Sequence, residues 1–322
     1  MQEEGLNLQH KEIETININR VFKSKGKTIQ ALNNVSIEIP KGYIASLVGP
    51  NGAGKTTLIK ILSTLMLPTS GKAYVHGFDI INETKNVRSS IGLATGGERL
   101  FYYRLTGYEN LLFFASLYGL SLGEAKRKSK ELLNIVGLSN FINIPYMKYS
   151  LGMQRRLALA RALINDPPVL LLDEPTLGID PISAREFRRL IKTLAQKKTV
   201  LLTSHYMSEV EELSDIVFLI KDGTILLKGS TEELKNKIGK IVELLLPLDF
   251  INDSISRFII SIRANKAFLR LPKSLIDTIN GNAEIIGESD PTLEDVYAVL
   301  IGESPINQGR GVRPVGWRHW SS

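Results

Sequence analysis

The spacing of hydrophobic residues changes several times along the chain, and each change predicts a different kind of element. Residues 13–22 (IETININRVF) and 31–39 (ALNNVSIEI) alternate apolar and polar positions, which predicts antiparallel strands at a sheet edge. Residues 43–49 (YIASLVG) are almost wholly apolar and predict a buried strand. Residues 56–66 (TTLIKILSTLM) predict a helix with one buried face. Its apolar positions are Leu58, Ile61, Leu62 and Leu65.

The middle of the chain is helical in character, and strands follow it. Amphipathic patterns run from about residue 106 to 161, and they precede the apolar runs VLLLDEP, TVLLTSH and IVFLIKDGTIL. Such runs are typical of buried parallel strands with helices on both faces of the sheet. Past Gly229, short strand-like and helical stretches alternate. We expect an α/β domain over residues 1–229 with a helical insertion at about 98–165, a small α+β domain over 230–302, and a loose tail over 303–322.

Composition places the chain among ordinary globular proteins. It has 322 residues, of which 43% are hydrophobic and 23% charged, and no cysteine, so a disulfide framework is excluded and a reducing cytosol is the natural compartment. The polar N-terminus lacks a signal-peptide pattern, and the apolar runs are far shorter than the ~18–20 residues that span a bilayer. The net charge of +7 suits an anionic surface of lipid or nucleic acid, but the charges are scattered, as on an ordinary solvated surface.

The segment GPNGAGKTT carries the first recognisable chemistry. It fits the pattern G-x-x-x-x-G-K-[ST], in which glycines let backbone amides close around a polyphosphate. Lys55 would reach the outer phosphates, and the Thr56 hydroxyl would bind Mg²⁺. The loop lies between a predicted buried strand and a predicted helix, the context that this motif requires. The predicted phosphate-binding residues are Gly49, Pro50, Asn51, Gly52, Ala53, Gly54, Lys55, Thr56 and Thr57.

Two later strands end in polar residues that suit phosphate chemistry. Asp173 and Glu174 follow VLLL, at the strand end where such sheets bind ligands. Asp173 is a candidate Mg²⁺ ligand, and Glu174 a candidate base that polarises the attacking water. His205 ends the next buried strand, so we expect it beside Glu174, where a ring nitrogen could donate to the γ-phosphate.

The stretch YSLGMQRRLALARAL, just before VLLLDEP, decides the family resemblance. Ser150 and Gly152 would offer a hydroxyl and backbone amides at a positive helix N-terminus. This stretch resembles the signature of ATP-binding cassette (ABC) ATPases, with Leu151 where the better-known form has glycine. The resemblance covers about residues 13–229 and preserves the order and spacing of every motif. It implies a P-loop NTPase fold that binds ATP and Mg²⁺.

The resemblance also assigns residues that spacing by itself does not. Phe22 stands where the family has an aromatic that stacks on adenine, although Phe22 could equally be core packing. Residues 150–153 form the signature, which in the family caps the nucleotide of a second subunit. The segment Leu177 to Asp180 is similar to the loop that touches its counterpart across the dimer, and Asp180 is its candidate nucleotide-contacting residue. His205 stands at the place of the switch histidine.

In function the chain resembles the motor subunit of a transporter. One cassette, no spanning segment and a C-terminal extension ending SDPTLEDVYAVLIG are similar to drug- and antibiotic-export ATPases of bacteria and archaea. The resemblance implies ATP hydrolysis, a second cassette, a separate integral permease and a peripheral place at the cytoplasmic face of the membrane, with no nucleic acid bound. The alternatives are a soluble ABC ATPase acting on nucleic acid or ribosomes, and an import-type motor. The substrate, the identity of the second cassette and the role of the Trp317 and Trp320 tail are left open.

One departure from the family concerns the residue after the strand that ends in Thr95. The family usually carries a glutamine there that binds Mg²⁺ and reports to the membrane partner, and this chain has Gly96 and Gly97, followed by Glu98. Glycine has no side chain to reach a metal. A Glu98 carboxylate near the phosphates would add negative charge, so we favour Glu98 as a contact to a basic residue of the permease over a metal ligand.

We expect Glu98→Gln to leave the basal ATP turnover of the free subunit intact, because a permease contact has no part in the chemistry. The same substitution should weaken the stimulation of turnover by the membrane partner. Steady-state ATPase assays with and without that partner check both expectations. A raised Mg²⁺ requirement in the isolated subunit would instead make Glu98 a metal ligand.

Overall fold

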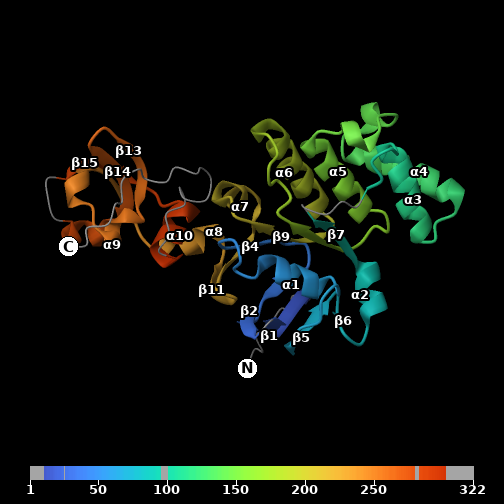
Figure 1. The fold of residues 1–322 in the computed structure, drawn as a ribbon, viewed down its shortest axis with the longest axis horizontal. Coiled ribbons are helices and arrows are strands. Elements are labelled where there is room, and N and C mark those ends of the chain that lie inside the picture. The colour runs from blue at the N-terminus through green and yellow to red at the C-terminus, as the bar shows by residue number, and fades with distance from the viewer. Residues whose placement is uncertain (1–10, 25, 96–100, 280–282, 302–322) are drawn as a thin grey trace, which may run out of the picture. The chain divides into compact units, whose positions relative to one another are not determined.

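The computed structural model describes residues 11–24, 26–95, 101–279 and 283–301 (Figure 1). The chain divides into two compact units, one up to Ser230 and one from Thr231 onward. The first unit contains two sheets and the second contains one, and each unit has its own hydrophobic core.

A six-stranded sheet forms the centre of the first unit, in the order β11-β10-β4-β9-β8-β7. The strands are β4 (Ile44–Val48), β7 (Ile91–Thr95), β8 (Val169–Asp173), β9 (Thr199–Ser204), β10 (Ile216–Lys221) and β11 (Thr224–Gly229). All neighbours are parallel except β10 and β11. The run IVFLIKDGTIL is therefore two antiparallel strands, because Asp222 and Gly223 turn the chain with φ angles of 48° and 75°. The rest of the predicted parallel core is confirmed.

The N-terminal strands form a second sheet of five strands rather than the edge of the parallel sheet. Its members are β1 (Lys11–Ser24), β2 (Lys27–Val35), β3 (Glu38–Pro40), β5 (Ser70–Val75) and β6 (Phe78–Asp79). Helix α1 (Lys55–Leu62) contributes Leu58, Ile59, Ile61 and Leu62 to a core cluster that includes residues of both sheets. Helix α1 thus packs against apolar residues of both sheets, and this packing holds the glycine loop that precedes the helix.

Helix α1 is shorter than the periodicity predicts. It ends at Leu62, and Thr64 adopts a φ angle of 61°, which turns the chain out of the helix. Leu65, expected on the buried face, is 59% exposed as a result. Helix α2 (Thr84–Ser90) follows, before β7.

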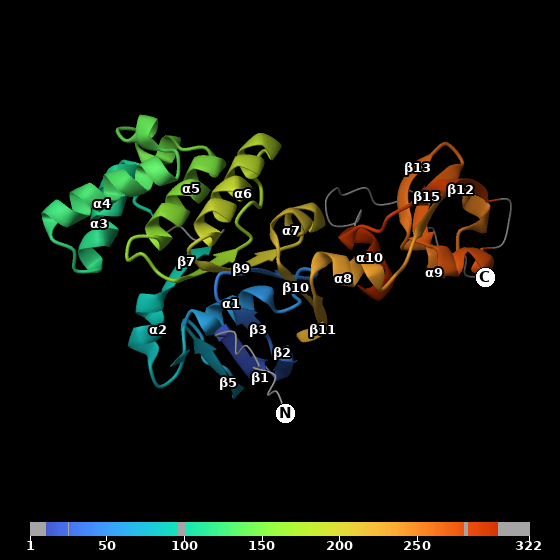
Figure 2. The same ribbon diagram turned by 180° about the vertical axis from the view of Figure 1, so that it is seen from behind.

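The helical segments lie on the opposite side of the parallel sheet from α1, and the first two of them pack on each other and on the third rather than on the strands (Figure 2). They are α3 (Gly107–Leu117), α4 (Leu122–Ile135), α5 (Leu151–Ala162), α6 (Pro181–Ala195) and α7 (Met207–Leu213), with single 3₁₀ turns at Ser139–Phe141 and Tyr146–Lys148. Capping boxes start α3 at Thr106 and α4 at Ser121. Each box satisfies backbone donors that would otherwise lack partners at a helix N-terminus.

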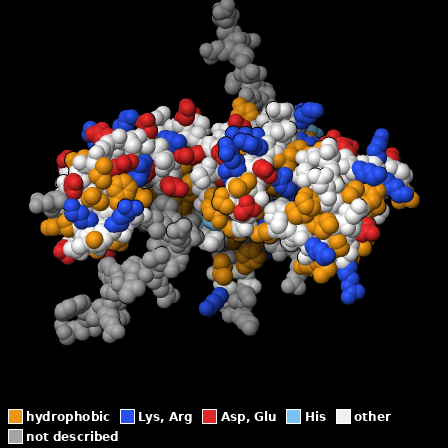
Figure 3. Space-filling view, turned by 90° about the horizontal axis from the view of Figure 1, so that it is seen from above, with side chains coloured by type: hydrophobic (Ala, Val, Ile, Leu, Met, Phe, Trp, Pro, Cys, Tyr) orange, Lys and Arg blue, Asp and Glu red, His pale blue; other side chains and the backbone are white. Residues whose placement is uncertain are grey.

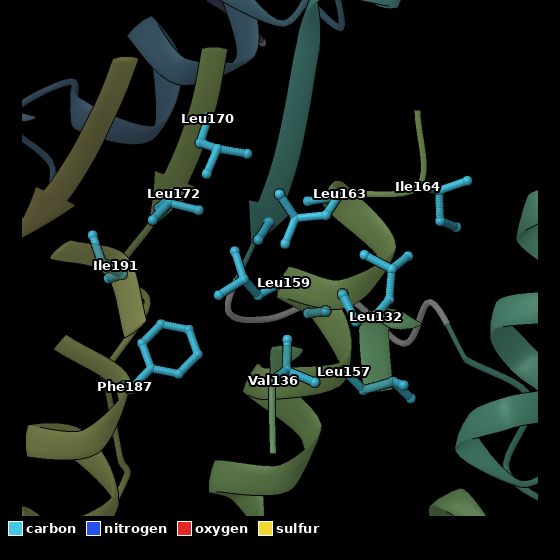
Figure 4. Close-up of a cluster of buried hydrophobic side chains, with 14 of the residues drawn as sticks. Leu132, Val136, Leu157, Leu159, Leu163, Ile164, Leu170, Leu172, Phe187 and Ile191 are labelled. Atoms are coloured by element: carbon cyan, nitrogen blue, oxygen red, sulfur yellow. The ribbon is translucent and has the colours of Figure 1, made fainter. Parts of the chain in front are cut away.

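Strand β8 shows how alternation holds the two layers on the sheet. Leu170 and Leu172 pack with residues of α5 and α6, among them Leu159 and Phe187 (Figure 4). Val169 and Leu171 point to the other face and join the cluster that holds α1. Because side chains alternate along a strand, Asp173, two residues after Leu171, also lies on the α1 side of the sheet.

The second unit is an α+β structure with a four-stranded antiparallel sheet in the order β13-β14-β12-β15. Its elements are α8 (Thr231–Asn236), β12 (Ile241–Pro247), a 3₁₀ turn (Leu248–Phe250), α9 (Asp253–Ser256), β13 (Ile259–Arg263), β14 (Lys266–Pro272), a 3₁₀ segment (Lys273–Thr278), β15 (Glu284–Ser289) and α10 (Leu293–Ile301). Arg270 bonds to both Glu243 and Asp295, joining the two central strands to α10.

Gly92 in β7 provides a test of how closely α5 packs on the sheet. A Cβ atom on Gly92 would lie 2.2 Å from the Ala162 backbone oxygen at the end of α5. Because backbone atoms cannot swing away, we expect Gly92→Ala to lower the free energy of unfolding by about 1–3 kcal/mol. Chemical denaturation measures this loss.

Gly123→Ala is the matched control, since Gly123 lies in α4 with no heavy atom within 4 Å of an added Cβ. This change should stabilise the protein by about 0.5–1 kcal/mol through helix propensity. Equal effects of the two substitutions would contradict the packing argument.

Candidate active site

The glycines at the two ends of the loop between β4 and α1 are required by their surroundings. A Cβ atom on Gly49 would stand 2.0 Å from the Ile220 backbone oxygen of the neighbouring strand. Gly54 has a φ angle of 105°, and its Cβ would lie 2.5 Å from the Ala31 oxygen. Any side chain at either position would displace backbone, so the loop can hold its narrow path only with glycine there.

Lys55 directs its ammonium group back over this loop. Its Nζ donates to the Gly49 oxygen at 2.6 Å and to the Pro50 oxygen at 3.0 Å, and lies 3.8 Å from Glu174 Oε1. The side chain is buried, and burial lowers the pKa of the ammonium, while Glu174 and Asp173 oppose that shift. A partly desolvated cation beside a glycine-rich loop is suited to bind a polyphosphate.

Asp173 joins three elements at the end of β8. The Thr56 hydroxyl of α1 lies 2.9 Å from Asp173 Oδ2, and the Thr203 hydroxyl of β9 donates to Oδ1 at 2.6 Å. On the other side, Thr95 of β7 is in register with Asp173. The buried Thr95 Oγ1 has no hydrogen-bond partner within the described parts of the chain. One carboxylate and three hydroxyls therefore lie together at this edge of the sheet.

This set of oxygen atoms fits a small hard cation. Carboxylate, hydroxyl, phosphate and water oxygens are the ligands that Mg²⁺ takes, usually with only one or two from the protein. Among the described residues no group of three or more His, Cys, Asp or Glu side chains could enclose a metal. A Mg²⁺ ion held here by Thr56 and Asp173 would thus need phosphate oxygens and water to complete its shell.

Glu174 begins the turn that leaves β8. Its φ angle is 48°, and its N–H donates to the Thr203 hydroxyl at 2.9 Å, so the backbone at this strained position is held by β9. Its Oε1 lies 3.5 Å from His205 Nδ1, a distance too long for a good hydrogen bond. The His205 ring, with Lys55 and Arg155, lowers the pKa of the Glu174 carboxyl despite its burial. Glu174 is therefore ionised at neutral pH.

The N-terminus of α5 is fixed by the loop that follows β8. The Ser150 hydroxyl caps the helix by accepting from the Met153 N–H at 3.3 Å. A Cβ on Gly152 would meet the Ser183 Cβ at 3.2 Å, so glycine allows close contact with the start of α6. Asp180 caps α6 by accepting from the Ser183 N–H at 2.9 Å.

Two further contacts attach α5 to the same loop. Arg155 donates to the Leu177 oxygen at 3.2 Å. A Cβ atom added to Gly178 would lie only 2.9 Å from Leu151 Cδ2, so the Leu151 side chain packs closely on Gly178. Leu151, which departs from the better-known signature, thus fills space beside a glycine with a φ angle of 78°. The start of α5 and residues 177–180 pack as one body.

Comparison with known proteins identifies this arrangement. A family model described as ABC transporter matches residues 32–177. The ATP-binding protein NatA of Bacillus subtilis is 40% identical over 216 residues, which are 67% of this chain and 88% of NatA. The chain belongs to the ABC transporter family. The resemblance drawn from its motifs is confirmed, and the protein is an ABC ATPase.

Other relatives of this ABC protein carry names that refer to drug resistance. The doxorubicin resistance ATP-binding protein DrrA of Mycobacterium tuberculosis is 39% identical, over 72% of this chain and 70% of DrrA. The linearmycin resistance ATP-binding protein LnrL of Bacillus subtilis is 38% identical, over 74% of this chain and 75% of LnrL.

Solved cassettes share the fold of the first unit. A dimeric ATP-binding cassette in a post-hydrolysis state with ADP and Pi bound has a TM-score of 0.61 and 27% identity, covering 68% of this chain and 98% of that one. CbiO1 of Clostridium perfringens, part of the CbiONQ complex, has a TM-score of 0.63 and 27% identity, covering 70% and 92%. The predicted P-loop NTPase fold is confirmed.

The remaining predicted site residues of the ABC domain lie apart from this cluster or outside the described structure. Phe22 is a half-buried residue of β1, and the Arg20 guanidinium lies 4.6 Å from the centre of its ring. Phe22 does not belong to the core cluster that contains α1 and residues of both sheets. Gly96, Gly97 and Glu98 lie outside the described residues, as do the tail tryptophans. No helix in the described ranges is both long enough and apolar enough to cross a membrane.

Sequence reasoning missed the residues that hold the catalytic candidates in place. Thr203 bonds to both Asp173 and Glu174, and Glu209 bonds to residues of two loops. Only the pair of hydroxyl residues immediately before His205 gave a signal, since hydroxyls at a strand end are able to bond across to the next strand. Glu209 gave none, because a glutamate in an acidic helix looks like solvated surface.

Proposed function

We propose that this ABC ATPase is the motor of an exporter and that it docks, as one of a pair of cassettes, on a separate membrane permease. The position of Glu174 supports the hydrolytic step that would drive such a motor, because its carboxylate lies between the Lys55 ammonium and the His205 ring and directly follows Asp173. The names of the relatives DrrA and LnrL favour export of a drug-like compound.

In the proposed reaction, the glycine loop and Lys55 bind the phosphates of ATP, and Thr56 and Asp173 hold Mg²⁺. When bound, Mg²⁺ would supply positive charge that offsets the negative charge of the phosphate oxygens. Glu174 orients a water molecule and accepts its proton as the new bond to the γ-phosphorus forms and the bond to the bridging oxygen breaks. His205 donates a hydrogen bond to the γ-phosphate, where negative charge must be stabilised.

The pairing of cassettes rests on the exposed start of α5. Ser150 is exposed at a helix N-terminus, where hydroxyl and amide groups favour an anion. We assign Ser150 and Gly152 to the nucleotide held by the second cassette, and Asp180 to the same interface. The dimeric form of the solved post-hydrolysis cassette supports this assignment.

A hollow of about 320 Å³ next to β7 is the proposed docking place of the permease. It is lined by residues of α2, α3, α5, β7 and the turn after α1: Ser63, Leu65, Arg88, Ile91, Leu93, Phe114, Tyr118, Arg161 and Ala162. Leu65 and Tyr118 are exposed apolar side chains at this hollow, and Arg88 and Arg161 make it basic. A short cytoplasmic helix of the permease with apolar residues and a carboxylate would match this lining.

One face of the molecule gives little support to a nucleic-acid function. On the face shown in Figure 3, Lys and Arg side chains lie scattered among acidic and hydrophobic ones rather than in one continuous track. Salt-sensitive binding of the purified protein to DNA or RNA, coupled to ATP turnover, would contradict the transport proposal.

We expect Glu174→Gln to bind ATP while its turnover falls by ~10² or more, because the amide keeps the shape of the carboxylate but cannot accept the proton. The variant should accumulate as a nucleotide-bound dimer. ATPase assays and size-exclusion chromatography with ATP test both expectations. Hydrolysis near the parent rate would show that the base lies elsewhere.

Reversal of one charge tests the docking place. Arg88→Glu should weaken association with the permease about tenfold, because a carboxylate of the partner would then face a like charge. Basal turnover of the free cassette should remain, since Arg88 contacts only Thr64 among the described hydrogen bonds. Lys72→Glu, on the exposed surface of β5, is the control. Copurification from native membranes measures the association, and equal losses in both variants would refute the docking assignment.

A further inference from the structure

Glu209 of α7 is a buried carboxylate that the proposed chemistry does not use. It is 2% exposed. Its Oε1 accepts from the Thr176 hydroxyl at 2.8 Å, and its Oε2 accepts from the Ser204 hydroxyl at 2.6 Å. Burial raises the pKa of Glu209, and the two hydroxyls, with Arg188 and His205, oppose this shift. Burial of a carboxylate costs free energy unless hydrogen bonds or nearby charges compensate it, so Glu209 depends on these two bonds.

The two hydroxyls belong to the two loops that carry the catalytic candidates. Thr176 is two residues after Glu174, and the Leu177 N–H closes that turn on the Glu174 oxygen at 3.2 Å. Ser204 directly precedes His205, and its hydroxyl also accepts from the Tyr206 N–H at 3.0 Å. One side chain therefore fixes the loop of Glu174 and the loop of His205 at once.

The last two residues of β9 form hydrogen bonds on opposite faces of the sheet. Thr203 points toward α1 and bonds to Asp173, while Ser204 points to the other face and bonds to Glu209. Adjacent residues of a strand alternate in direction, so β9 is held from both sides at its last two positions. The 3.5 Å separation of Glu174 and His205 depends on how these two loops are placed.

We propose that Glu209 is a positioning residue, which sets the distance between Glu174 and His205 by joining the loops that carry them. This inference rests on the roles proposed for those two residues. In this role Glu209 does not contact the substrate. A misplacement of about 1 Å in a catalytic group can lower the rate ~10²-fold, so the loss of one buried bridge can lower the rate of ATP turnover measurably.

The test compares Glu209→Leu, which removes both acceptors at similar volume, with Glu209→Gln, which keeps hydrogen-bonding groups at both ends. We expect Glu209→Leu to lower kcat at least about tenfold while the Kd for ATP, measured without turnover, stays within about threefold. Glu209→Gln should keep kcat within about threefold of the parent. Loss of ATP affinity with kcat unchanged, or loss of kcat to the same degree in both variants, would overturn the proposal.

Glu212→Leu is the matched control on the same helix. Glu212 pairs with Arg188 at 2.6 Å on the surface, so its loss should change neither kcat nor Kd by more than about twofold. An equal fall of kcat in this variant would show that α7 tolerates no change and would overturn a specific role of Glu209.

A double substitution identifies the route of the effect. If Glu209 acts through the loops, Glu209→Leu should cost little further in a His205→Ala background, because residues acting as a unit are not additive. Full multiplication of the two losses would overturn the proposal. Should Glu209→Leu fail to fold, Thr176→Val and Ser204→Ala each remove one hydroxyl and should each lower kcat, and parent rates in both would refute it.

The same measurements separate this inference from the function beneath it. Retained turnover in Glu174→Gln would refute the proposed chemistry whatever Glu209 does. Full turnover in Glu209→Leu, together with an inactive Glu174→Gln, would refute only the positioning role.

Discussion

The Asp173 carboxylate is the point on which the site depends, because it accepts hydroxyl donors from two other elements. Thr56 brings the start of α1 to it, and Thr203 brings the end of β9. Thr56 follows Lys55 directly, and the Lys55 ammonium is held over the glycine loop by its own bonds to the Gly49 and Pro50 oxygens. Hydrogen bonds to a carboxylate are stronger than bonds between neutral groups, and these two join the ends of β8 and β9 to the start of α1 without any ligand.

Parallel pairing explains how residues far apart in the chain reach this point. Strands β7, β8 and β9 lie side by side in register, so Thr95, Asp173 and Thr203 form a row across the sheet. The carboxyl ends of all three strands then open at one edge, where phosphate binds in such folds. The antiparallel sheet on the other side of α1 has no part in that row, but it closes the core that holds the helix in place.

The contacts around the loop after β8 tie this edge to the helical insertion. Thr176 bonds to Glu209 of α7, and the next carbonyl, at Leu177, accepts from Arg155 of α5. These two bonds connect the loop that carries Glu174 to α7 and to α5, the helix that starts after Ser150. Such a connection is what a motor needs if hydrolysis at one edge is to be felt elsewhere in the subunit.

The sequence by itself predicted the glycine loop and singled out Lys55, Asp173, Glu174 and His205 as candidate site residues, because these predictions depend on local spacing and on the residues that phosphate chemistry requires. Tertiary structure decided the rest. The short α1 and the exposed Leu65 follow from a left-handed turn at Thr64 that periodicity does not report. The partners of Asp173 and the bridge at Glu209 depend on the order of the strands and on the face of the sheet toward which each side chain points. The sequence does not show whether a hydroxyl or a carboxylate is solvated or is bonded to another loop.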